Sequence, residues 1–126
     1  AEAAAVAERV GLGLWLNTLS GLLSHGQQRQ LELGLVLAAK PHLLLLDEPM
    51  AGMGPDESES MVVLLQTLRG DVTILLVEHD MDAVFRLADT ISVLVAGQVI
   101  ATGSAQAIRD NPEVRRAYLG DDEAVA

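Results

Sequence analysis

The sequence predicts an α/β fold in which mostly parallel, buried strands are flanked by helices. Residues 43–46 are four consecutive leucines, followed by two adjacent carboxylates. Such a run is typical of a strand that is buried on both faces. A second run, rich in β-branched residues, follows at 72–77. Amphipathic helical patterns alternate with these two runs, and that alternation indicates a parallel sheet.

Composition limits the classes of protein that the chain can represent. Its 126 residues, 50% of them apolar, suffice for one domain with a core. The formal net charge of −10 argues against nucleic acid as a partner. The chain has no cysteine, hence no disulfide framework, and no apolar run of the ~18 residues that a membrane span needs. The start, Ala1–Ala5, has no basic region, so we expect no signal peptide. The missing initial Met is compatible with a processed chain or a piece of a longer one.

The first forty residues predict two helices around an irregular stretch. Strong helix formers at 2–10 predict a helix that ends at Gly11 or Gly13. Residues 12–21 are apolar without a regular period, which indicates a loop or short turns. Trp15 in this stretch is expected to fill a core or an interface rather than to bind a ligand.

The second helix begins with a capping box. Ser24 is followed three residues later by Gln27, a pattern in which each side chain caps the backbone of the other residue. The helical spacing continues to Ala39, and Lys40-Pro41 closes it. Because the helix becomes apolar nearly all round, we expect its end to be deeply buried.

A third helix lies between the two predicted strands. After the strand at 43–47, residues 50–55 form a small-residue loop. Asp56 with Glu59 is a second capping signal. The helix that follows has the spacing of an amphipathic helix, with an apolar stripe made of Met61, Leu64, Leu65 and Leu68.

The remaining residues predict small elements. A helix is expected at 81–88, then a hairpin of two short strands around Ala96-Gly97. Ser104 and Asn111 should each cap a small helix, the second with a proline at its first position. The acidic tail 121–123 is expected to fray. Two strands buried on both faces need more neighbours than these elements supply, so the predicted sheet is incomplete.

The chemistry is expected at the carboxyl ends of the strands. Asp47 and Glu48 end the first strand, and ligands of open α/β sheets bind at that edge. An aspartate in this place can hold Mg2+ on a nucleoside triphosphate. The alternative is a turn of solvated acids. His79 similarly follows the second strand, and a lone histidine is usually structural. For Ser24 the alternative is that it does no more than cap the helix.

Three motifs in order and spacing resemble the carboxyl-terminal half of an ABC transporter ATPase subunit. They are the signature at 23–30 (LSHGQQRQ), the Walker B strand at 43–49 (LLLLDEP) and the switch histidine His79. The stretches 77–81 and 111–120 are similar to the importer subgroup for branched-chain amino acids, or for urea and amides. The resemblance covers essentially the whole chain.

This resemblance implies an incomplete P-loop NTPase-type domain. Residues 1–126 would be the carboxyl-terminal part of one ABC ATPase domain. Residues 1–40 would end its helical subdomain with the signature helix, and residues 41–126 would run from Walker B to the carboxyl terminus. The sequence contains no Gly-x-x-x-x-Gly-Lys-[Ser/Thr], so the phosphate cradle of the amino-terminal half is absent. We therefore expect this fragment alone to be inactive.

The resemblance also implies the roles of the site residues. Glu48 would polarise the attacking water and His79 would contact the γ-phosphate, while Asp47 would hold Mg2+ through water. The signature, which faces the ATP of the partner subunit, would be Ser24, His25, Gly26 and Gln27. His25 departs from the usual glycine of the signature. Gly54 stands where the family has Asp or Asn, which puts the coupling of the subunits through that loop in doubt.

The function implied is that of the ATP-binding and ATP-hydrolysing subunit of an importer for branched-chain amino acids or related small solutes. Its cofactors would be ATP and Mg2+. Its partners would be a second ATPase subunit and membrane-spanning permease subunits, on the cytoplasmic face of the membrane, with no nucleic acid. The fragment itself is expected to self-associate through its exposed sheet edge.

Two alternatives remain open at this point. One is an ATPase of the same superfamily that serves DNA repair or chromosome structure, against which the acidic charge and the lack of a heptad region argue. The other is a non-catalytic association module. Whether the chain binds nucleotide discriminates between an association module and an ATPase.

Overall fold

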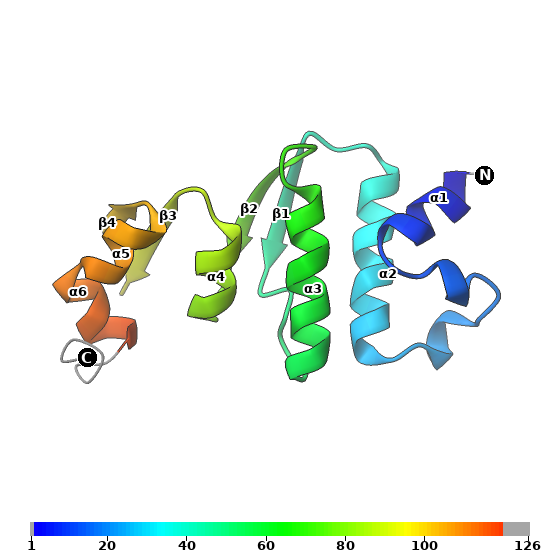
Figure 1. Cartoon of the computed structure of the whole chain (residues 1–126), viewed down its shortest axis with the longest axis horizontal. Coiled ribbons are helices and arrows are strands. Elements are labelled where there is room, and N and C mark those ends of the chain that lie inside the picture. The colour runs from blue at the N-terminus through cyan, green and yellow to red at the C-terminus, as the bar shows by residue number, and fades with distance from the viewer. Residues whose placement is uncertain (1, 120–126) are drawn as a thin grey trace. The chain divides into compact units, whose positions relative to one another are not determined.

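The structure is a computed structural model and describes residues 2–119 (Figure 1). The chain divides into two compact units, Ala1–Ala83 and Val84–Ala126. The predicted acidic tail at 121–123 lies outside the described residues, and the predicted subdomain limit at residue 40 stays a prediction. Among the residues that the structure describes, no helix has the length and apolar character needed to cross a membrane.

The first unit begins with α1 (Glu2–Arg9), two 3-10 turns (Gly13–Trp15 and Ser20–Leu22) and α2 (His25–Ala38). Gly11 has φ +82°, a left-handed backbone that ends α1 as predicted. The two 3-10 turns confirm the irregular stretch.

Helix α2 begins with the predicted capping box. The Gln27 N–H donates to Ser24 Oγ at 3.2 Å, and the Ser24 N–H donates to Gln27 Oε1 at 2.9 Å. Toward its end Leu33 and Leu37 are buried, whereas Leu35 and Val36 are exposed. The prediction of deep burial all round is therefore wrong for half of that surface, because the described residues cover α2 on one side.

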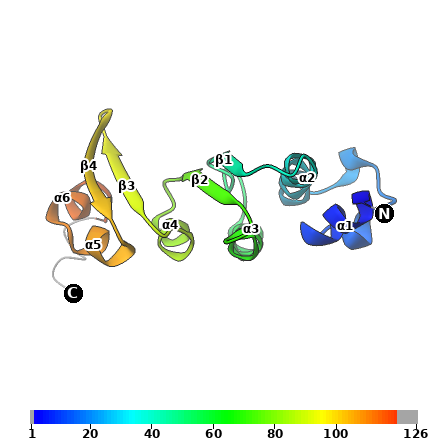
Figure 2. The same cartoon turned by 90° about the horizontal axis from the view of Figure 1, so that it is seen from above.

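Strands β1 (Leu43–Asp47) and β2 (Thr73–Val77) form a parallel two-stranded sheet, in register from Leu43–Thr73 to Asp47–Val77. Helix α3 (Pro55–Leu68) lies along one face of this sheet (Figure 2). Leu44 on that face is 1% exposed. On the opposite face Leu45 is 68% exposed. The parallel α/β arrangement is confirmed, but burial of both faces is wrong, because within residues 2–119 a helix layer covers one face of the pair and leaves the other exposed.

Helix α3 carries the predicted apolar stripe, which is buried: Met61, Leu64, Leu65 and Leu68. Its start differs from the prediction. Gly54 is the N-cap and Pro55 the first helical residue, with no side chain capping the backbone. Proline has the helical φ already and lacks an N–H that would need a cap, so the helix begins before Asp56. Asp56 lies in the first turn instead, where its charge favours the helix dipole.

Helix α4 (Met81–Leu87) spans the limit between the units. The second unit then contains the antiparallel hairpin of β3 (Ile91–Val95) and β4 (Gln98–Gly103). Ala96 and Gly97 both have positive φ, 50° and 79°, as a tight two-residue hairpin turn requires.

Two short helices, α5 (Ala105–Asp110) and α6 (Pro112–Val114), and a π-helical turn at Arg115–Leu119 complete this unit. The Ser104 and Asn111 side chains cap α5 and α6 as predicted. The core of the unit is a cluster of buried side chains from the hairpin and the two helices: Ile91, Val93, Ile108 and Val114.

Candidate functional site

The carboxyl ends of β1 and β2 bring three of the predicted site residues together. The register pairs Asp47 with Val77, so Glu48 and His79 follow immediately beyond the paired ends. The Glu48 N–H donates to the Val77 carbonyl at 2.7 Å and extends the ladder by one bond. Glu48 has φ +47°, and this left-handed backbone interrupts the alternation of the strand. The carboxylates of Asp47 and Glu48 are therefore free to take different roles.

Glu48 and His79 form a hydrogen-bonded pair. His79 Nδ1 lies 2.8 Å from Glu48 Oε1, and the two side chains are 73% and 47% exposed. The hydrogen bond to Glu48 and the negative charge of that carboxylate raise the pKa of His79 above 6.5. The pair is thus an acid–base couple that solvent reaches, at the edge of the sheet where ligands bind.

Glu78 organises the turn that carries His79. Its side chain is buried, and its Oε1 accepts hydrogen bonds from the backbone N–H groups of His79 and Asp80 at 3.0 and 3.4 Å. Among the described residues its Oε2 is buried and has no hydrogen-bond partner. Glu78 belongs to none of the three motifs, and its position next to His79 is the sequence signal that points to it.

Replacing Glu48 with Gln is expected to lower the pKa of His79, because the charge that stabilises the imidazolium is removed. A group whose pKa is raised by folding stabilises the folded state fully below its unfolded pKa. That contribution is lost as the pH rises through the folded pKa. NMR titration of the His79 ring in the chain and in the Glu48→Gln variant measures this shift. A Glu113→Gln variant is the control, and an unchanged His79 pKa in Glu48→Gln contradicts the pairing.

The four signature residues lie at the amino terminus of α2. Ser24 and Gln27 are joined by the capping box. Gly26 is buried, and a Cβ at this position would lie 2.9 Å from Glu57 Cδ of α3. A side chain at this position would displace the Glu57 carboxylate, a contact that no sequence pattern indicated.

His25 connects this helix end with the loop after β1. Its Nε2 lies 3.2 Å from the carbonyl oxygen of Ala51. Its ring also lies against Gly52, where a Cβ would stand 3.2 Å from Nε2. The signature and the loop that follows Glu48 are thus in direct contact through one side chain.

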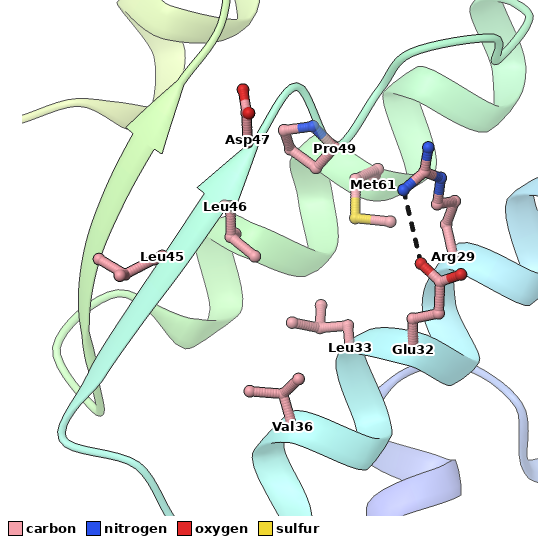
Figure 3. Close-up of a pocket in the computed structure, with 9 residues that line it drawn as sticks. All are labelled: Arg29, Glu32, Leu33, Val36, Leu45, Leu46, Asp47, Pro49 and Met61. Atoms are coloured by element: carbon pink, nitrogen blue, oxygen red, sulfur yellow. Dashed lines mark hydrogen bonds and ion pairs between the residues drawn. The ribbon is translucent and has the colours of Figure 1, made fainter.

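A pocket of about 210 Å³ lies between α2, β1 and α3 (Figure 3). Its cation, Arg29, is paired with Glu32 at 3.5 Å, and most of the other walls are apolar. Asp47 borders the pocket, and in Figure 3 its carboxylate points away from the Arg29–Glu32 pair. The pocket is lined by Arg29, Glu32, Leu33, Val36, Leu45, Leu46, Asp47, Pro49 and Met61. Because a triphosphate needs several hydrogen-bond donors, a pocket whose lining arginine is already paired with Glu32 is a poor site for one.

The carboxylate ligands at the strand ends suit Mg2+ better than they suit a metal ion that takes all its ligands from the protein. Asp47 presents an exposed carboxylate at the end of β1. Within the described residues there is no group of three or more His, Cys, Asp or Glu that could hold a metal ion. Mg2+ keeps several waters and takes one or two carboxylates together with substrate phosphates. One aspartate therefore suffices for the part that this chain would contribute.

Comparison with protein-family models gives two matches. The model described as ABC transporter matches residues 1–51, and the model described as branched-chain amino acid ATP-binding cassette transporter matches residues 98–124. The two matches lie at opposite ends of the chain and agree with each other.

Curated relatives and solved structures give the same result. The chain is 43% identical to the branched-chain amino acid transport ATP-binding protein BraF of Pseudomonas aeruginosa, over 90% of this chain and 46% of BraF. It is 42% identical to LivG of Escherichia coli K12, over 95% of this chain and 48% of LivG. It also resembles a solved ATP-binding cassette of an ABC transporter in the ADP conformation, with TM-score 0.81 and 29% identity over 94% of this chain and 49% of that one. The chain spans about half the length of the curated relatives that it matches.

Proposed function

The chain belongs to the ABC transporter ATP-binding family, and on this premise we propose that it forms the carboxyl-terminal half of the ATP-hydrolysing subunit of an importer. The observation that carries the proposal is the pair of Glu48 and His79, 2.8 Å apart at the carboxyl ends of two parallel strands. The similarity to BraF and LivG supports branched-chain amino acids or related small solutes as cargo.

In this proposal Glu48 acts on the water that attacks the γ-phosphorus. Its carboxylate accepts the proton as the new P–O bond forms, while the bond to the β,γ-bridging oxygen breaks and ADP leaves. His79 donates to Glu48 through Nδ1, and its Nε2 would contact the γ-phosphate. Its raised pKa favours the imidazolium, whose charge suits a phosphate oxygen.

Asp47 would hold Mg2+ through a water molecule. The bound ion would neutralise charge on the transferring phosphoryl group. Ser24, His25, Gly26 and Gln27 would face the ATP held by a second ATPase subunit, since the amino terminus of α2 favours anions. Membrane-spanning permease subunits would be the other partners, with the ATPase on the cytoplasmic face of the membrane.

Titration calorimetry with Mg-ATP tests the proposal on the chain itself. We expect no detectable binding, because the sequence contains no P-loop motif, whereas the full-length subunit should bind. Micromolar binding by the chain would contradict the roles given to Asp47, Glu48 and His79. The exposed apolar side chains on β1 and β2 further support self-association of the chain, so light scattering on the same preparation should give a mass above that of a monomer.

A further inference from the structure

Three hydrogen bonds, joined through the covalent structure of Ala51 and Glu48, link the amino terminus of α2 to the Glu48–His79 pair. His25 Nε2 lies 3.2 Å from the Ala51 carbonyl oxygen, and the Ala51 N–H donates to the Glu48 carbonyl at 3.0 Å. The Glu48 carboxylate then accepts from His79. The peptide groups of Ala51 thus stand between the two histidines, with Glu48 as the last link.

The loop that contains Ala51 is shaped to receive the His25 ring. Gly52 has φ +76°, and a Cβ there would lie 3.2 Å from His25 Nε2, closer than ordinary van der Waals contact. Gly52 therefore serves two purposes: it makes the turn, and it leaves room for the imidazole. Met50, which precedes Ala51, is buried and so helps to anchor the loop.

The far end of the loop is held less firmly by side chains. A Cβ at Gly54 would meet no atom within 4 Å, and Gly54 caps α3 without any side-chain hydrogen bond. The His25 ring supplies an anchor near the middle of the loop, within three residues of Glu48.

We propose that His25 is a positioning residue for Glu48. Its Nε2–H holds the Ala51 carbonyl, the Ala51 amide holds the Glu48 backbone, and the carboxylate is thereby kept in reach of His79. The inference rests on the proposed function and deepens it. His25 would face the ATP held by the second subunit, and here it also positions the Glu48 carboxylate, which would activate water in its own subunit. A change in the position of His25 at the amino terminus of α2 would thus alter the position of Glu48 in the same subunit.

Two polar substitutions of matched character separate this role from a purely structural one. The amide of Gln can occupy the position of Nε2, so His25→Gln retains a donor for Ala51. The amide of Asn reaches only the position of Nδ1, so His25→Asn loses it. In the full-length subunit we expect His25→Asn to lower kcat about five-fold with KM for ATP unchanged, the effect of one hydrogen bond. His25→Gln should recover most of the kcat that His25→Asn loses, whereas a His42→Ala control should stay within about two-fold of the parent, since the His42 side chain is exposed.

A double-mutant cycle with Glu48→Gln shows whether His25 acts through Glu48. If it does, His25→Asn has no further effect on the residual single-turnover rate of Glu48→Gln. Equal fold losses in both backgrounds overturn the proposal, as does a raised KM with unchanged kcat, which would mean direct contact with nucleotide. A loss in His25→Gln as large as that in His25→Asn also overturns it.

A spectroscopic measurement on the 126-residue chain keeps the two proposals distinguishable. The His79 ring signals in NMR should shift in His25→Asn and stay in place in His25→Gln and His42→Ala. Unchanged His79 signals in His25→Asn overturn the positioning role without reference to ATP. If instead the signals shift but Glu48→Gln leaves turnover intact, the proposed function fails and the link from His25 to Glu48 stands.

Discussion

Full-length subunit carrying Glu48→Gln is expected to hydrolyse ATP at least about 100-fold more slowly than the parent, the usual range for loss of a general base. The amide cannot take up the proton that the attacking water releases. Gln has the same shape as Glu and places no extra demand on the backbone, so ATP binding should be retained. Steady-state turnover and nucleotide titration on the same preparations measure the two quantities.

The matched control for this prediction is Glu113→Gln, the same chemical change at an exposed position in α6. It should leave turnover within about two-fold of the parent. Turnover in Glu48→Gln above a tenth of the parent value would remove Glu48 from the role of base. Equal loss of binding and turnover would indicate a damaged fold rather than a missing base.

Leu68→Ala is expected to have the largest effect on the stability of the first unit. Leu68 is 0% exposed and lies at the end of the buried stripe by which α3 supports the sheet. Truncating such a side chain removes its transfer free energy and leaves a cavity, at a cost of about 2–5 kcal/mol in the free energy of unfolding. Urea denaturation followed by the fluorescence of Trp15, the single tryptophan of the chain, reports on this unit.

Leu14→Ala provides the comparison, because Leu14 is 97% exposed in the same unit. Its effect should stay within about 0.5 kcal/mol. A Leu68→Ala loss below about 1 kcal/mol would show that the α3 stripe contributes little to holding the sheet.

The local structure could be predicted from the sequence wherever a few adjacent residues decide it. Ser24 with Gln27, Ser104 and Asn111 cap their helices as predicted, and Ala96-Gly97 makes the hairpin turn. In each case the donor and the acceptor lie within three residues of each other, so no tertiary contact is needed to form the pair.

The burial of the strand faces and the choice between two competing caps could not be predicted. The leucine run at 43–46 indicated burial on both faces, but burial requires partner elements, and β1 has one strand and one helix layer beside it. The start of α3 was misplaced because Asp56 matches a cap as well as Gly54-Pro55 does, and only the backbone geometry decides between them.

The candidate site shows the same division. The resemblance named Asp47, Glu48 and His79, and the register of β1 with β2 explains why they lie at the same edge of the sheet. The contact of His25 with Ala51 and that of Gly26 with Glu57 join residues 26 and 31 positions apart, respectively, and no spacing pattern encodes them.

The left-handed backbone of Glu48 depends on the pairing of β1 with β2. A non-glycine residue at φ +47° is strained by about 1–2 kcal/mol, so surrounding bonds must hold it there. Two of those bonds come from the second strand and the turn after it: the Val77 carbonyl accepts from the Glu48 N–H, and His79 binds the carboxylate. A β1 strand that has not yet paired has neither, and its Glu48 would relax to an extended conformation. The geometry of the Glu48–His79 pair therefore exists only in molecules whose two strands have paired, and it is lost when the strands separate.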